Sequence, residues 1–203
     1  VLPSAFSDQA PACGLILGSG WGSALRIDRA LARVSYRDIP GLGASTVVGH
    51  AGELLLFERR GLRVAAFMGR RHWYEGAGWE PVVMPVELLR RLGAPCVLIT
   101  NAAGGISPSL QPGRLMALRD HINAAGLNPL IGPLVPGWGP RFPDQSHIYD
   151  EALIDLLRKA GFDNLNIDLM FAIPTQTLDL WKTTLREAMA LGSEHLSCYE
   201  VIY

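Results

Sequence analysis

The amino-acid sequence predicts an α/β fold in which a mixed sheet is flanked by helices. Short apolar runs end abruptly in glycine-rich loops, which is typical of buried strands that lead into tight turns. Two apolar segments around Arg60-Gly61 indicate an antiparallel hairpin. Toward the C-terminus, helical patterns alternate with strand patterns, which favours parallel pairing.

The composition limits the classes of function. The 203 residues are enough for one α/β domain with a substantial core. The net charge of −1 gives no reason to expect a nucleic-acid or membrane partner. The cysteines Cys13, Cys96 and Cys198 lie far apart in the sequence and show neither CxxC nor metal-ligand spacing. We therefore expect no metal site and a reducing, cytoplasmic setting.

The first expected strand covers Cys13–Leu17 and leads into Gly18-Ser19-Gly20. A helical pattern over residues 23–34 follows this loop. A strand, a glycine loop and a helix in this order would point backbone N–H groups and a helix dipole at an anion. The alternative for Gly-Ser-Gly alone is a sharp turn that requires glycine φ angles.

The predicted hairpin pairs Glu53–Phe57 with Arg63–Phe67. Just before it lies Gly49-His50-Ala51-Gly52. A histidine between glycines has little core to pack into, so His50 either faces solvent or contacts a ligand.

Directly after the hairpin, residues 69–76 read Gly-Arg-Arg-His-Trp-Tyr-Glu-Gly. Arg70, Arg71, His72 and Glu75 concentrate charge at the end of a strand. A surface loop with solvated charges would give the same pattern. Arginine, however, can fork two donors onto a phosphate, and the concentration favours an anion site.

A helix is expected over Pro81–Leu92, with Gly93 as its end. It leads to a buried, central strand that begins at Val97 and is followed by Thr-Asn-Ala-Ala-Gly-Gly at residues 100–105. This loop has almost no side chain, so an anion or small ligand could approach its N–H groups closely. A plain tight turn after a core strand is the alternative.

The second half predicts a further strand over residues 114–119 and then a long segment rich in Gly and Pro that ends near Asp144. A loop of this length is usually functional or an interface. The tail predicts, in order, a helix, a strand, a helix and a strand, which is a parallel βαβ pattern; they cover residues 152–160, 165–171, 178–191 and 195–202.

The composition changes near Glu151. Before it lie 20 of the 22 glycines and 13 of the 14 prolines, whereas the lysines of the chain, Lys159 and Lys182, follow it. This change indicates two sequence origins.

Residues 1–150 resemble the trimeric purine nucleoside phosphorylase family. Seven motifs match in order and spacing: Gly18-Ser19-Gly20, Gly49-His50-Ala51-Gly52, Gly69-Arg70-x-His72-x-Tyr74-Glu75-Gly76, Asn101-Ala102-Ala103-Gly104-Gly105, Asp120-His121-Ile122-Asn123, Asn128-Pro129-Leu130 and Arg141-Phe142-Pro143-Asp144. The resemblance implies a nucleoside-phosphorylase-like twisted mixed sheet flanked by helices. It also implies phosphorolysis of purine (deoxy)ribonucleosides to free purine and (deoxy)ribose 1-phosphate.

The resemblance further implies the site residues and partners. Inorganic phosphate would be the co-substrate, with no cofactor, and the assembly a homotrimer. Tyr74 would line the nucleoside site, and Phe142 would reach the site of a neighbouring subunit. His72 and Glu75 would be catalytic, with Glu75 orienting His72 or a water. The phosphate ligands would be Ser19, His50, Arg70, Arg71, His72 and the backbone N–H of Ala102.

From about Ala152 the chain resembles a fragment of the radical S-adenosylmethionine proteins related to coproporphyrinogen oxidase and haem chaperones. The matching residues are Ala160-Gly161-Phe162, Asn166 to Phe171, Pro174-x-Gln176-Thr177 and His195 to Tyr199. The tail lacks the cysteine motif that would hold an iron–sulfur cluster, so it cannot perform radical chemistry alone. We interpret the chain as a chimera: a phosphorylase-like part over 1–150 and a foreign α-β-α-β segment over 151–203 of the same domain.

Our hypothesis for the tail is that it replaces the native segment element for element and completes or extends the sheet. Gln176 would then lie near the position of the family's purine-reading glutamate, and Ser197 near that of a phosphate-contacting serine. The alternatives to an active enzyme are a non-catalytic phosphate- or nucleoside-binding protein and a recombined chain with no evolved function.

Overall fold

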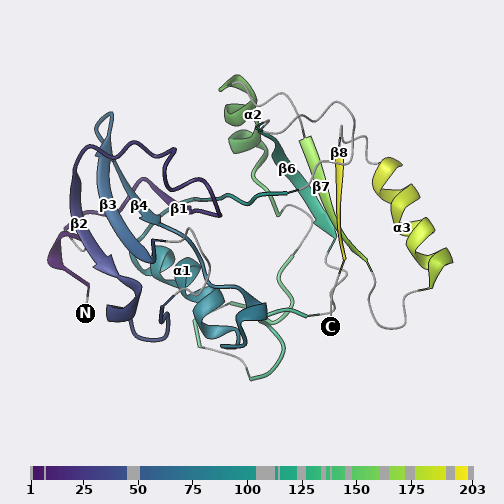
Figure 1. Cartoon of the computed structure of the whole chain (residues 1–203), viewed down its shortest axis with the longest axis horizontal. Coiled ribbons are helices and arrows are strands. Elements are labelled where there is room, and N and C mark those ends of the chain that lie inside the picture. Colours follow the sequence, from purple (N-terminus) through teal and green to yellow (C-terminus); the bar gives the residue numbers. More distant parts are fainter. Residues whose placement is uncertain are drawn as a thin grey trace. The chain divides into compact units, whose positions relative to one another are not determined.

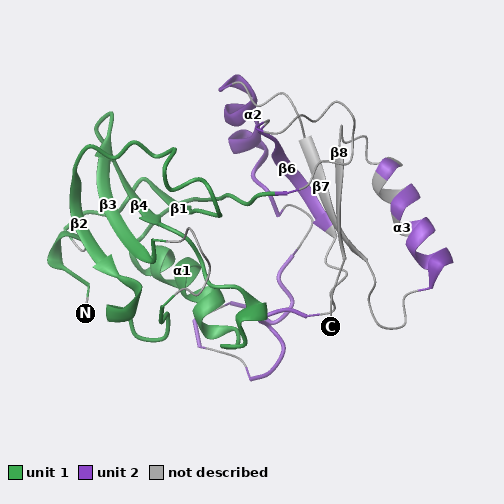
Figure 2. Ribbon diagram, in the orientation of Figure 1, with its two compact units in different colours: residues 1–102 green, residues 103–203 purple. Residues whose placement is uncertain are grey.

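The computed structural model contains two sheets and three α-helices among the residues that it describes (Figure 1). These residues are 2–6, 8–44, 51–103, 113, 115–122, 127–133, 136–137, 139–144, 148–160, 165–171, 177–190 and 195–200. The chain divides into two compact units, Val1–Ala102 and Ala103–Tyr203 (Figure 2). The predicted boundary between sequence origins, residue 150, lies inside the second unit.

The first unit is built on a five-stranded mixed sheet with the order β2-β3-β4-β1-β5. Its strands are β1 (Cys13–Ile16), β2 (Ala30–Ser35), β3 (Glu53–Arg59), β4 (Leu62–Phe67) and β5 (Val97–Ile99). The central strand β1 pairs in parallel with both β4 and β5. The pairs β2–β3 and β3–β4 are antiparallel. The mixed sheet expected from the sequence is confirmed.

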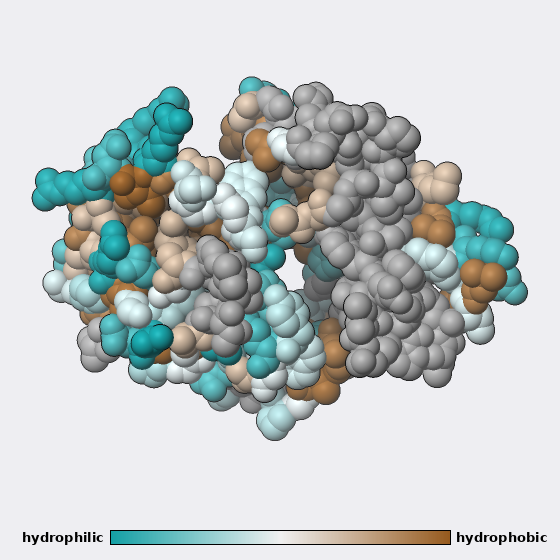
Figure 3. All heavy atoms as spheres, viewed as in Figure 1, coloured by the Kyte–Doolittle hydropathy of each residue, from teal (hydrophilic) through white to brown (hydrophobic). Residues whose placement is uncertain are grey.

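The β3–β4 hairpin turns at the two predicted residues. Arg59 pairs with Leu62, and the two residues between them, Arg60 and Gly61, have φ values of 53° and 76°. Two consecutive positive φ angles match the right-handed twist of the flanking strands, and glycine adopts such an angle without steric cost. The tip carries the exposed side chains Glu58, Arg59 and Arg60, and hydrophilic atoms project at this end of the unit in Figure 3.

The helix predicted over residues 23–34 is wrong. Residues 22–25 form turns instead, and Ala30–Ser35 is strand β2. The segment is rich in alanine, leucine and arginine, which favour helix, but pairing with β3 overrides this weak local preference. No helix dipole therefore follows the Gly18-Ser19-Gly20 loop directly.

Helix α1 (Glu80–Arg91) confirms the predicted helix over residues 81–92. Pro81 lies in its first turn, where its missing N–H costs no hydrogen bond. Gly93, with φ 78°, follows the helix. The buried face carries Pro81, Pro85 and Leu89.

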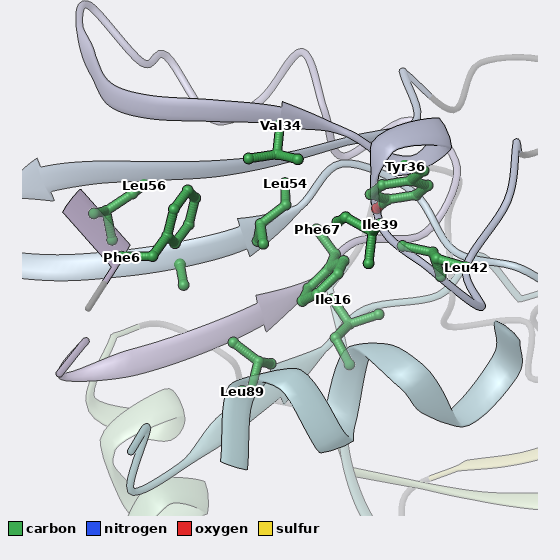
Figure 4. Close-up of a cluster of buried hydrophobic side chains, with 11 residues drawn as sticks. Phe6, Ile16, Val34, Tyr36, Ile39, Leu42, Leu54, Leu56, Phe67 and Leu89 are labelled. Atoms are coloured by element: carbon green, nitrogen blue, oxygen red, sulfur yellow. The ribbon is translucent and has the colours of Figure 1, made fainter. Parts of the chain in front are cut away.

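The main core lies between α1 and the sheet (Figure 4). Leu89 of α1, Ile16 of β1 and Phe67 of β4 are each at most 4% exposed. Tyr36 is fully buried and packs at a ring-centroid distance of 5.8 Å from Phe67. The remaining buried members of this cluster are Phe6, Val34, Ile39, Leu42, Leu54, Leu56 and Ala65.

Strand β5 confirms the predicted strand but not its predicted burial. Val97, Leu98 and Ile99 are 37%, 39% and 52% exposed. Among the described residues, β5 is the edge strand of the five-stranded sheet and pairs with β1 alone. An apolar run alone does not distinguish a central strand from an edge strand.

The second unit contains a parallel three-stranded sheet, β6-β7-β8, and two helices. The strands are β6 (Ala117–Ile122), β7 (Leu165–Phe171) and β8 (His195–Glu200), and the helices are α2 (Glu151–Lys159) and α3 (Leu178–Ala190). The predicted α-β-α-β order of the tail is confirmed. The strand predicted over residues 114–119 lies further along the chain. It includes Asp120, His121 and Ile122, which the sequence predicts to open the following loop.

The tail strands join β6, which precedes residue 150. Ala117 of β6 pairs with Leu165 of β7, and Asn166 of β7 pairs with His195 of β8. In the part of the chain that the structure describes, the strands after residue 150 thus extend β6, and not the sheet of β1 to β5 that the sequence predicts the tail to complete or extend. Among the described residues, the sheet of β6 to β8 is separate from that of β1 to β5.

Candidate functional site

Three loops begin at one edge of the five-stranded sheet. Ile16, the last residue of β1, is in register with Phe67 of β4 and with Ile99 of β5. All three strands are parallel, so the loops that follow them leave the sheet at the same edge. These loops start at residues 17, 68 and 100. They carry the predicted ligands Ser19, Arg70, His72 and Ala102.

The loops after β1 and β5 are in direct contact. The Gly18 N–H donates to Oγ1 of Thr100 at 2.9 Å, and the Thr100 N–H donates to the carbonyl of Ile16 at 3.0 Å. A Cβ at position 18 would lie 2.6 Å from the Thr100 carbonyl oxygen, so only glycine fits there. The next residue, Ser19, and Ala102 are both exposed.

Arg70 connects the loop after β4 to the loop after β5. Its Nη1 donates to the Thr100 carbonyl at 2.5 Å. Burial lowers the pKa of the Arg70 guanidinium from its ordinary value, and the charge of Tyr74 acts in the opposite direction. Arginine remains protonated under physiological conditions. The edge of the sheet thus presents a half-buried positive charge.

Glu75 organises the loop after β4. Its Oε1 accepts a hydrogen bond from the His72 N–H at 2.6 Å and lies 3.3 Å from His72 Nδ1. Its Oε2 accepts from Nε of Arg71 at 2.8 Å. The Glu75 side chain is 2% exposed. One buried carboxylate therefore fixes both the arginine and the histidine, in a single 3₁₀ turn over Trp73–Glu75.

The sequence predicts Arg71 as a phosphate ligand, but its guanidinium has other partners. Besides Glu75, it donates from Nη1 to the carbonyl of Leu42 at 3.2 Å. Arg71 is 9% exposed. This geometry favours a role in which Arg71 holds the loop in place over one in which it contacts an anion directly.

Tyr74 projects from the 3₁₀ turn and is 74% exposed. Its ring stacks on the His72 ring, with a centroid distance of 4.8 Å and an interplanar angle of 17°. Trp73 stacks in the same way on Trp79, at 4.5 Å and 26°. The aromatic pairs keep this turn in a defined orientation.

Tyr36 positions the start of the loop, and sequence reasoning missed it. Its hydroxyl donates to the Gly69 carbonyl at 2.6 Å, and its N–H donates to the Gly52 carbonyl at 2.8 Å. Burial, with the charge of Glu53, raises the pKa of the Tyr36 phenol, which keeps it protonated as a donor. A lone tyrosine at the end of a strand gives no signal of this role in the sequence.

The predicted His50 lies outside the described residues. Its motif ends at Gly52, whose N–H donates to the carbonyl of Met68 at 3.1 Å. Met68 precedes Gly69 and Arg70. The end of the 49–52 motif therefore lies next to the loop after β4.

The remaining predicted ligands belong to the second unit. Phe142 is 88% exposed. Ser197 lies in β8, opposite Asp168 of β7. Gln176 lies outside the described residues.

The described part of the chain shows neither a metal-ion cluster nor a membrane-spanning helix. No group of three or more His, Cys, Asp or Glu side chains there could hold a metal ion. No helix among the same residues is long and apolar enough to cross a membrane.

A sequence model of the phosphorylase superfamily matches residues 13–175, a range that includes all three loops. The chain belongs to the phosphorylase superfamily. The match continues past residue 150, where the sequence predicts that the phosphorylase-like part ends.

Several phosphorylase relatives are similar over most of this chain. It is 44% identical over 167 residues to purine nucleoside phosphorylase 1 of Bacillus subtilis (strain 168), covering 82% of this chain and 61% of the relative. It is 45% identical over 154 residues to purine nucleoside phosphorylase 1 of Geobacillus stearothermophilus, covering 75% and 56%. The match to the Bos taurus purine nucleoside phosphorylase is 39% over 157 residues, covering 76% and 53%. The chain thus spans less than two thirds of the length of these curated relatives.

The solved structures that this chain resembles are, like the sequence relatives, named purine nucleoside phosphorylases. A Schistosoma mansoni purine nucleoside phosphorylase in complex with inosine superimposes with a TM-score of 0.71 at 30% identity, covering 95% of this chain and 70% of that one. A purine nucleoside phosphorylase in complex with ribose-1-phosphate gives 0.70 at 29% identity, covering 98% and 76%. The nucleoside-phosphorylase-like mixed α/β fold is confirmed.

Proposed function

We propose that this chain catalyses the phosphorolysis of purine nucleosides, releasing free purine and (deoxy)ribose 1-phosphate. One observation carries the proposal. The half-buried guanidinium of Arg70 donates a hydrogen bond to the Thr100 carbonyl. This bond lies at the edge of the sheet where the loops after β1, β4 and β5 begin. The relatives named purine nucleoside phosphorylase support the choice of substrate.

In this proposal the three loops bind inorganic phosphate. Ser19 offers a hydroxyl, Ala102 a backbone N–H, and Arg70 a guanidinium that can fork onto two phosphate oxygens. His50 would join them from the 49–52 motif. The phosphate oxygen attacks C1′ of the nucleoside, and the C1′–N bond to the purine breaks. Holding the two reactants in line and stabilising the developing charge are the tasks of the protein.

His72 contacts phosphate in the proposal, and Glu75 acts through it. The Nδ1 atom of His72 lies 3.3 Å from the Glu75 carboxylate, so Nε2 is the nitrogen that we assign to phosphate. Glu75 is then a positioning residue and makes no contact with substrate. Arg71, although its sequence position predicts a phosphate ligand, would hold Glu75 in place through the 2.8 Å ion pair.

The nucleoside site would be lined by Tyr74 and completed by Phe142 of a neighbouring subunit in a homotrimer. The exposure of both rings, 74% and 88%, is compatible with contacts to a ligand or to another subunit. The enzyme would need no cofactor and would act in the cytoplasm, the setting that the cysteine usage favours.

The tail would replace the native base-binding segment. The α-β-α-β order of the tail supports this part of the proposal. The structural match to the inosine complex also supports it, because a match over 95% of this chain must include most of residues 151–203. Gln176 and Ser197 would then contact the nucleoside and phosphate, respectively. A neutral Gln176 in place of a glutamate would stabilise the departing purine less, because hydrogen bonds to charged groups are about twice as strong.

The test is the phosphorolysis of inosine by the purified chain, with and without phosphate. We expect phosphate-dependent release of hypoxanthine, and a loss of about 10²- to 10³-fold in kcat/KM for Arg70→Ala. Arg91→Ala is the matched control, because Arg91 is an exposed arginine that pairs with Glu87 on α1. Hypoxanthine release that does not depend on phosphate would contradict the proposal.

A second candidate is a phosphate-binding protein without turnover. It is favoured by the tail sequence, in which the neutral Gln176 would stand where the family has its purine-reading glutamate. Phosphate binding by a folded chain that releases no hypoxanthine would select this candidate over the enzyme.

A further inference from the structure

Two cysteines that lie far apart in the sequence meet at the amino ends of β1 and β5. The parallel register pairs Gly14 with Val97, so Cys13 and Cys96, each one residue earlier in the chain, lie next to one another. The Gly14 N–H donates to the Cys96 carbonyl at 2.9 Å, which fixes this pairing. Neighbouring strands lie about 4.8 Å apart, within the Cα separation of about 4.4–6.8 Å that a disulfide spans.

The thiol groups point to the same side and interact. The Cys13 Sγ contacts the carbonyl of Gly14 at 3.3 Å, and the Cys96 Sγ contacts the carbonyl of Ala12 at 3.7 Å. Burial, hydrogen bonding to the Cys96 thiol and the charge of Cys96 raise the pKa of Cys13 to about 12. Both cysteines are only partly buried, so a small reagent can reach them.

The pair lies away from the candidate phosphate site. Cys13 is the first residue of β1, whereas Ser19 follows the last residue of that strand. Likewise, Cys96 precedes β5 and Ala102 follows it. No step of the proposed phosphorolysis uses either thiol.

We propose that Cys13 and Cys96 form a reversible intrachain disulfide by exchange with a small-molecule disulfide such as oxidised glutathione. The Cys96 thiolate attacks one sulfur of the reagent, which forms a mixed disulfide and releases one small thiolate. The Cys13 sulfur, having given its proton to solvent, then attacks the Cys96 sulfur and releases the second small thiolate. The protein loses two electrons and two protons, and the reagent is reduced to two thiols.

The order of the two steps follows from the environment of Cys13. Its high pKa makes it a poor first nucleophile, because only the thiolate attacks. Once Cys96 is part of the mixed disulfide, it carries no negative charge and no S–H group. Two of the causes that raise the pKa of Cys13 are then removed, which favours the second step.

The experiment uses the full reduced chain and oxidised glutathione as the probe, followed by mass spectrometry and peptide mapping. We expect the intact mass to fall by two hydrogens, with no glutathione retained and with the Cys13 and Cys96 peptides linked. We also expect the oxidised chain to melt on the order of 5 °C higher, because the bond closes a long loop in the unfolded state.

Single-residue variants distinguish formation of the intrachain disulfide from attachment of glutathione to one cysteine. Cys13→Ser should stop at the glutathione adduct of Cys96, because the thiol that faces Cys96 has been removed. Cys198→Ser, which changes the third cysteine of the sequence, should still form the linked peptides. A wild-type chain that retains glutathione on Cys96 without closing, or that links Cys198 to either partner, would overturn the proposal.

Discussion

Glu75 is the residue on which the geometry of the candidate phosphate loop depends most. Its carboxylate is 2% exposed and is shared between Arg71 and His72. Removing the charge of one partner in a buried ion pair leaves the other uncompensated, which is strongly destabilising.

We predict that Glu75→Gln lowers the free energy of unfolding by about 2–4 kcal/mol. Urea denaturation followed by circular dichroism measures this loss. Asp179→Asn on α3 is the control, because Asp179 is 96% exposed, pairs with Lys182 at 3.8 Å, and such surface pairs contribute little. Equal stabilities for the Glu75 variant and the parent would contradict the ion-pair account.

Tyr36 acts on the same loop from inside the core. Tyr36→Phe removes the hydroxyl that donates to the Gly69 carbonyl and leaves this buried acceptor without that bond. We expect the free energy of unfolding to fall by about 1–2 kcal/mol. The same change at the exposed Tyr74 should cost less than about 0.5 kcal/mol. If the two variants were equally stable, the hydroxyl of Tyr36 would have no structural role.

The positions of the candidate ligands could be predicted from the sequence only where the backbone alone decides them. Ser19, Arg70 and Ala102 follow strand ends, and parallel strand ends share an edge, so their proximity follows from strand order. The partners of Arg71 and the role of Tyr36 depend on side-chain packing between distant segments. No local pattern in the sequence encodes that packing.

At the scale of elements, α1 covers the sheet through a narrow apolar face. Leu89 is 2% exposed and belongs to the main core (Figure 4). Val86, on the same helix, is 47% exposed. We predict that Leu89→Ala lowers the free energy of unfolding by about 2–4 kcal/mol, because it removes buried methyl groups and leaves a cavity.

Val86→Ala is the matched control and should cost less than about 0.5 kcal/mol. Both values come from the midpoint and slope of urea unfolding. A large loss in the Val86 variant with a small loss in the Leu89 variant would mean that α1 packs through another face.

Most helices and strands could be predicted from local sequence patterns. The incorrect predictions concern features that depend on how distant strands pair. The hairpin, α1 and the tail elements have strong periodicity or turn residues, and they are confirmed. The segment 23–34 has the composition of a helix, yet residues 30–35 pair with β3. The exposure of β5 likewise depends on its place at the sheet edge, which only the whole topology decides.

For the whole molecule, the proposed nucleoside site requires several subunits to assemble. If Phe142 completes the site of a neighbouring subunit, the chain must form a homotrimer. Light scattering should then give three times the 22.0 kDa mass of one chain. We expect Phe142→Ala to raise the KM for inosine while the trimer persists. A monomer at micromolar concentration would contradict this arrangement.

The proposed function depends on the binding of inorganic phosphate by the loops after β1, β4 and β5. The most direct measurement is isothermal titration of the purified chain with phosphate, comparing Arg70→Ala with Arg91→Ala. We expect saturable phosphate binding that is retained in Arg91→Ala and weakened at least about tenfold in Arg70→Ala, since a charge-assisted bond contributes about 1.5–3 kcal/mol. Equal phosphate affinity in the two folded variants would contradict the proposed phosphate site.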